Sequence, residues 1–167
     1  ISSNTHTMAG NLSGAGTISF TSGTLNIAGS NTMTGTFNAG TGTVNFNGTG
    51  GQTIKAASYY NLGTSGSGTK VLQGAITING NLAVSGTTTL LTNQYQITGT
   101  SSGTLTMDSG TSLLIGNPAN ATGVSFPSIF TSSNILLNSN STVSYQANTS
   151  QTISATPVYG HLTTATS

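Results

Sequence analysis

Few side chains in this sequence have the chemistry of a catalytic acid, a catalytic base or a metal ligand. Asp108 is the only carboxylate side chain, and His6 and His161 are the only imidazoles. Enzymes that cleave polysaccharides need paired carboxylates for acid–base work, and calcium sites need several oxygen ligands. One carboxylate cannot supply either arrangement. We therefore expect no enzyme activity and no catalytic, cofactor-binding or metal-binding residue.

The remaining reactive patterns are equally sparse. His6 and His161 lie far apart and neither belongs to a ligand motif, so the sequence predicts exposed or hydrogen-bonded histidines. The Gly-rich segment 63–68 lacks the Gly-Lys-Ser/Thr of a phosphate-binding loop, which favours a flexible turn. Lys55 and Lys70 could form an amide with an Asn only beside a buried acid, which the single Asp would have to supply.

Threonine pairs of the form Thr-x-Thr recur along the chain, at 32–36, 41–43, 98–100 and 104–106. Flat threonine arrays on solenoids resemble ice-binding surfaces, which makes a ligand-binding face one hypothesis. Threonine is also a favoured outward residue on short strands, and these pairs do not recur at one fixed interval.

The composition excludes several classes of partner. Thr, Ser, Asn and Gly make up more than half of the 167 residues, and only Lys55, Lys70 and Asp108 carry full charges. Two lysines cannot neutralise a nucleic-acid backbone, so we expect no nucleic-acid partner. The sequence has no basic patch for anionic lipid and no run of membrane-spanning length, so we expect no membrane insertion. Cysteine is absent, so no disulfide contributes to the fold.

The elements that would position these residues are short strands. In the segment 71–84, Ile76 and Ile78 point to one face while Thr77 points to the other, and Leu82 and Val84 repeat that alternation. Asn and Gly stand between such pairs and suit sharp corners. Similar apolar pairs recur roughly every seven to ten residues, and no window has useful helical periodicity. The pattern predicts strands of about three to five residues that are joined by polar corners.

A longer internal repeat is also present. Thr43–Phe46 corresponds to Thr142–Tyr145, Gln52 to Gln151 and Tyr60 to Tyr159, each by subtraction 99 residues apart; near the end the match slips by one, since Leu62 best matches Leu162. We therefore expect one continuous unit over residues 1–167, made of a repeat at 1–99 and a partial repeat at 100–167. Since the chain opens with Ile1 and has no initiator Met, we also expect a piece of a longer chain or a processed product.

Two all-β architectures fit this pattern. The first is a parallel β-solenoid, a right-handed β-helix with short strands and about 20–25 residues per turn. The second is a pair of tandem immunoglobulin-like sandwiches, because a period near 99 residues fits one such domain. Sandwich strands are usually longer and enclose aromatic anchors, whereas this sequence has short strands, regular corners and no Trp. These features favour the solenoid, with Val44 and Val143 at equivalent positions four or five turns apart.

The segments 42–54, 59–62, 68–70 and 76–82 resemble the repeats of very large surface proteins of Bacteroidota. The resemblance implies export by the type IX pathway and a role as an adhesin or filament-like protein on the bacterial cell surface. It brings no active-site motif, so no functional residue is inferred from it.

These expectations lead to one leading function and one alternative. The leading hypothesis is a structural repeat module of a long extracellular adhesin or surface filament, which acts as a rigid stalk or assembly unit. Its partners would be neighbouring repeats or identical subunits stacked end to end, with a surface or glycan as a further candidate. The alternative is a ligand-binding β-solenoid that presents an ice-binding or glycan-binding surface.

Overall fold

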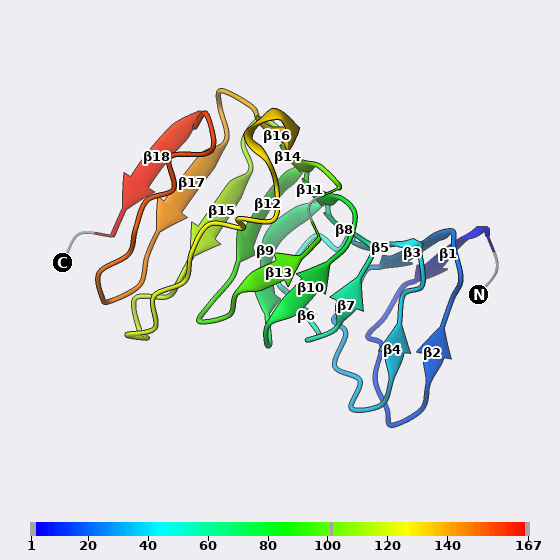
Figure 1. Cartoon of the computed structure of the whole chain (residues 1–167). Helices are drawn as coiled ribbons and strands as arrows, with labels where there is room; N and C mark the ends of the chain where they lie inside the picture. The colour runs from blue at the N-terminus through cyan, green and yellow to red at the C-terminus, as the bar shows by residue number, and fades with distance from the viewer. Residues whose placement is uncertain (1–2, 101, 166–167) are drawn as a thin grey trace.

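The chain folds as a parallel β-solenoid of about eight turns. The computed structural model describes residues 3–100 and 102–165. Every pairing between two named strands is parallel. This confirms the predicted solenoid, and the alternative of immunoglobulin-like sandwiches is wrong because those domains are built from antiparallel sheets. The first strand, β1 (Thr5–Met8), and the last, β18 (His161–Thr164), lie at opposite ends of the coil (Figure 1).

The strands stack into columns that form the sides of the coil (Figure 1). The seven-stranded sheet contains β1 (Thr5–Met8), β3 (Thr24–Ile27), β5 (Thr43–Phe46), β8 (Asn61–Thr64), β11 (Leu82–Val84), β14 (Leu105–Met107) and β16 (Ile135–Leu137). The six-stranded sheet contains β6 (Gln52–Ile54), β9 (Ser67–Leu72), β12 (Thr87–Leu91), β15 (Ser112–Ile115), β17 (Thr142–Tyr145) and β18 (His161–Thr164).

Shorter strands form the remaining side. A three-stranded sheet contains β7 (Ser58–Tyr59), β10 (Ile76–Ile78) and β13 (Ile97–Gly99), and a two-stranded sheet contains β2 (Ile18–Ser19) and β4 (Phe37–Asn38). The rings of Phe37 and Tyr59, both buried, lie 5.9 Å apart and connect these two sheets. In the described part of the chain the only helix is a single 3-10 turn, η1 (Ser132–Asn134).

Strand register shows that the turns differ in length. We take the number of residues between two register partners as the length of a turn. From Leu62 to Leu82, and from Leu82 to Leu105, this length agrees with the prediction. The step from Val44 to Leu62 is slightly shorter than predicted. The step from Leu105 to Ile135 is the longest on the seven-stranded sheet, because that turn contains η1 and the loop that precedes it.

The core is one thin column that follows the predicted alternation. On the seven-stranded sheet the inward residues include Leu25, Val44, Leu62, Leu82 and Leu105, and all of them are buried. They belong to a single cluster of buried apolar side chains that extends from Leu12 to Tyr145. Because each turn covers the apolar residues of the turn before it, burial depends on stacking between turns.

Polar side chains add bonds between turns. Asn45 Nδ2 donates to Asn26 Oδ1 at 3.1 Å on the outer face of the seven-stranded sheet. Inside the coil, the hydroxyls of Thr64 and Thr88 lie 3.1 Å apart and both residues are buried. These contacts are the Asn and Thr ladders that a stacked repeat permits, and the inner Thr pair satisfies hydroxyls that the narrow core would otherwise leave unpaired.

The internal sequence repeat does not coincide with a whole number of turns. Val44 lies in β5 on the seven-stranded sheet, whereas Val143 lies in β17 on the six-stranded sheet. The prediction that these residues are equivalent around the coil is therefore wrong. The physical reason is the uneven turn length, because the long turn between Leu105 and Ile135 moves the second copy onto the next side.

Candidate functional site

The structure keeps the acid and the two imidazoles apart. Asp108 is exposed at a corner after β14, where its carbonyl accepts a hydrogen bond from Thr111 Oγ1 at 2.7 Å. His6 lies in β1 and His161 in β18, near opposite ends of the coil (Figure 1). Across residues 3–100 and 102–165, no group of three His, Cys, Asp or Glu residues could hold a metal ion. The absence of catalytic chemistry stays a prediction.

Lys70 is chemically unusual, because it is buried without an acid, whereas the sequence suggested it only as one partner of an amide with an Asn. Its side chain is fully buried at an inward position of β9, and its ammonium donates to three carbonyl oxygens. These belong to Gly48 at 2.8 Å, Gly50 at 3.0 Å and Ser67 at 2.9 Å. Burial lowers the pKa of the Lys70 ammonium. The available signal was the alternation in Thr69–Leu72, which places Lys70 and Leu72 on the same inward face.

Lys55 and the Gly-rich segment 63–68 both contact the turn below them. Lys55 Nζ donates to the carbonyl of Met33 at 2.6 Å. Gly66, within the segment 63–68, adopts a positive φ of 76° at a corner between β8 and β9. A Cβ built there would lie 2.5 Å from the carbonyl oxygen of Gly48, so this corner stacks tightly on the turn below. The predicted flexible turn is thus a close-packed corner.

The Thr-x-Thr pairs noted in the sequence do not converge on one surface. Residues 32–36 precede β4 and lie outside the strands, while Thr104 and Thr106 flank an inward residue of β14. A different hydroxyl column does form on the outer face of the six-stranded sheet. It consists of Thr69, Thr89, Ser112 and Thr142, which are consecutive partners in register. An aliphatic column of Val71, Leu91 and Leu114 lies beside it.

Large apolar side chains are exposed mainly near the C-terminal end of the coil. Among the described residues, the exposed ones are Tyr60, Leu136, Ile153, Val158 and Leu162. Leu162 occupies an inward register position, opposite the buried Val143. Its exposure has a simple cause, since no further turn in this structure lies over β18.

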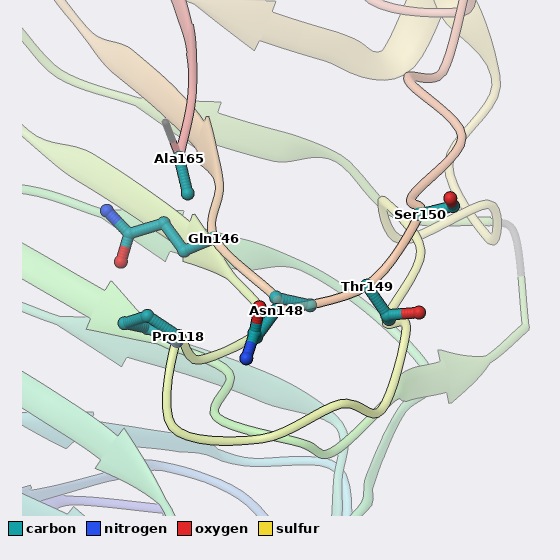
Figure 2. Close-up of a pocket in the computed structure, with 7 residues that line it drawn as sticks. Pro118, Gln146, Asn148, Thr149, Ser150 and Ala165 are labelled. Carbon is teal, nitrogen blue, oxygen red and sulfur yellow. The ribbon is translucent and has the colours of Figure 1, made fainter. Parts of the chain in front are cut away.

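A hollow of about 600 Å³ opens beside the last turn. We call it the end hollow and define it by the residues that line it: Pro118, Gln146, Ala147, Asn148, Thr149, Ser150 and Ala165. Figure 2 shows the corner of residues 146–150 passing between Ala165 and the loop that carries Pro118. A second, smaller pocket shares Ala147, Thr149 and Ala165 with it and extends to Ile153.

The lining of the end hollow is polar and uncharged. Its side chains are amides, hydroxyls, a proline ring and methyl groups, and none of them ionises at neutral pH. The residues that line the hollow include no acid–base pair.

Comparisons with known proteins found no match. No family model matches the chain, and neither the curated proteins nor the solved structures contain a significant relative. No helix in the part of the chain that the structure describes is long and apolar enough to cross a membrane.

Proposed function

We propose that this chain is a structural repeat module of a long extracellular bacterial adhesin or surface filament, where it acts as a rigid stalk. One observation carries the proposal. Two parallel sheets, of seven and six strands, continue from turn to turn with a single apolar core between them. A load along such a coil is shared by many backbone hydrogen bonds, and the described turns form one continuous stack rather than separate beads.

The surface chemistry supports an extracellular, load-bearing role. With only three charged side chains, the module has little self-repulsion and its interactions change little with ionic strength. The resemblance to type IX-secreted repeats of Bacteroidota supports the same location. The partners of the module would be neighbouring repeats or identical subunits that stack on its ends.

Immunogold electron microscopy of intact cells of the source organism tests this proposal. Antibodies raised against the folded chain should label fibres or a layer on the outside of unpermeabilised cells. Brief protease treatment of intact cells should remove the label. Labelling that appears only after permeabilisation would refute the extracellular stalk. An antibody against a cytoplasmic protein of the same cells provides the control.

A ligand-binding surface is the second candidate function, supported by the hydroxyl column of the six-stranded sheet. Thr69, Thr89, Ser112 and Thr142 repeat at the inter-strand spacing of roughly 4.8 Å, beside an aliphatic column. Such a face could order water or contact a repetitive surface. Thermal hysteresis of the pure chain, compared with a Thr89→Tyr variant, tests ice binding. Equal values for both proteins and for buffer would eliminate it.

A further inference from the structure

The sequence contains two Asn-Gly pairs, Asn47-Gly48 and Asn79-Gly80. Asparagine deamidates most readily before glycine, because glycine has no side chain to hinder the reaction. The backbone nitrogen of the glycine attacks the side-chain carbonyl carbon of the asparagine, and ammonia leaves as a succinimide ring closes. Water then opens the ring and yields aspartate or isoaspartate.

The attacking nitrogen is hydrogen-bonded in both pairs. The backbone N–H of Gly48 donates to Gln52 Oε1 at 2.8 Å, and the backbone N–H of Gly80 donates to the carbonyl of Tyr60 at 2.8 Å. A nitrogen that is held by such a bond in a packed corner cannot turn towards the neighbouring Asn side chain. Deamidation at either pair therefore requires the corner to open first.

The acceptors of these two bonds differ in kind. At Gly80 the acceptor is a main-chain carbonyl of the turn below, so the bond is part of the stacking of the coil. At Gly48 the acceptor is a side chain that follows in the same turn, so the bond depends on a single residue, Gln52. A substitution can therefore remove the bond at Gly48 and leave the bond at Gly80 in place.

The Gln52 side chain is itself fixed by the coil. It is buried, and its Nε2 donates to the carbonyl of Ile27 at 2.7 Å and to the carbonyl of Gly29. The carbonyl of Gly48 is also engaged, because it accepts from Lys70 Nζ at 2.8 Å. Bonds from the same turn and from the turn above therefore hold Gly48 on both sides.

The products of deamidation do not fit this corner. Asn47 Oδ1 is buried and has no hydrogen-bond donor among the described residues, so a carboxylate there would bury charge without a partner. Isoaspartate would add a methylene group to the main chain beside Gly48. Even a Cβ at Gly48 would lie 2.2 Å from the carbonyl oxygen of Ala28 in the turn below. Either product should therefore weaken the contact between these two turns.

We propose that Asn47 is a latent deamidation site, which Gln52 protects by accepting the N–H of Gly48. Loss of that hydrogen bond frees the Gly48 nitrogen to attack Asn47 Cγ, with release of ammonia. Hydrolysis of the succinimide by water then converts Asn47 to aspartate or isoaspartate. The inference goes beyond the proposed stalk and does not depend on it, because the reaction needs only this corner and water.

Mass spectrometry of peptic fragments, after the full chain has aged in neutral buffer, tests the proposal. Gln52→Met keeps the length of the side chain but removes the acceptor, and it should raise the deamidation rate of Asn47 at least about tenfold. Asn79 in the same sample is the internal control, and its rate should stay within about twofold of the wild-type rate. An unchanged rate at Asn47 would overturn the proposal. Equal acceleration at Asn47 and Asn79 would also overturn it, because protection would then come from folding of the whole coil.

The second sequence copy offers a matched control. Gln151 Oε1 accepts the backbone N–H of Ala147 at 2.7 Å, but the residue before Ala147 is Gln146, so this corner has the same glutamine bond without an Asn-Gly pair. Gln151→Met should therefore leave the deamidation rate of Asn47 unchanged. In concentrated urea, the wild type and Gln52→Met should deamidate at Asn47 at equal rates, because the unfolded chain lacks the bond. A difference that persists in urea would contradict the structural cause.

Discussion

At the scale of single residues, Lys70 shows how this fold buries a cation without an acid. The chain has one carboxylate, Asp108, and it is exposed at another corner. Three main-chain carbonyls instead replace the water around the ammonium, two of them from the turn below. The aliphatic stem fills the core column between Gln52 and Leu90, so one side chain both packs and joins two turns.

Replacing Lys70 should therefore cost more stability than replacing Lys55. Lys70→Met keeps most of the stem but leaves buried carbonyls unpaired, so we expect a loss of about 2–3 kcal/mol in the free energy of unfolding. Lys55→Met removes a single bond, to Met33, from a partly buried position and should cost less than about 1.5 kcal/mol. Urea denaturation measures both. Equal losses would contradict the role given to the three carbonyls.

Tyr59 should make stability sensitive to alkaline pH. Burial raises the pKa of its phenol well above the ordinary value of 10.0. Above pH 10 the unfolded state therefore loses this proton while the folded state keeps it, so stability falls as pH rises. We expect the stability of the wild type relative to Tyr59→Phe to be about 1.4 kcal/mol lower at pH 11 than at pH 9. A difference that stays constant between these pH values would contradict this account.

At the scale of elements, the corners determine how closely successive turns approach. Gly66 and Gly110 have nearly identical φ angles, of 76° and 77°. A Cβ at Gly66 would lie 2.5 Å from the carbonyl of Gly48, whereas a Cβ at Gly110 would meet nothing within 4 Å. The two glycines thus separate the cost of the left-handed backbone from the cost of stacking.

Alanine substitutions at these two glycines measure that separation. Gly110→Ala should cost only the conformational term, about 1 kcal/mol. Gly66→Ala should cost at least about 3 kcal/mol, because the added methyl group forces two turns apart. Thermal unfolding of the two variants gives the comparison. If Gly66→Ala is as stable as Gly110→Ala, the corner does not control the stacking distance.

At the scale of the whole molecule, stability should vary along the coil. Each turn contacts only the turns next to it, so inner turns are supported on both faces and end turns on one. β8 and β11 lie in the middle of the seven-stranded sheet, whereas β18 is the last strand of the six-stranded sheet and is exposed throughout. Local opening of β18 should therefore require much less free energy than local opening of β8 or β11.

Amide hydrogen exchange measures this gradient. Amides of Leu62 and Leu82 should exchange at least about a hundredfold more slowly than those of Leu162 and Thr164. Uniform protection along the chain would show that the coil opens as a single unit, in conflict with the nearest-neighbour account.

The sequence alone determined the strands, the corners and the fold class. Alternation at Ile76–Ile78 and Leu82–Val84 is a local property with period two, and Asn and Gly between such pairs suit corners. These signals do not depend on which turn lies above or below. They were therefore enough to predict a parallel solenoid and a thin apolar core.

Only the tertiary structure decided which residues meet between turns. The carbonyl partners of Lys70, the side on which Val143 lies and the exposure of Ile153 all depend on contacts across a whole turn. The turn from Leu105 to Ile135 is much longer than the turn from Val44 to Leu62, so equal sequence spacing does not give equal positions around the coil.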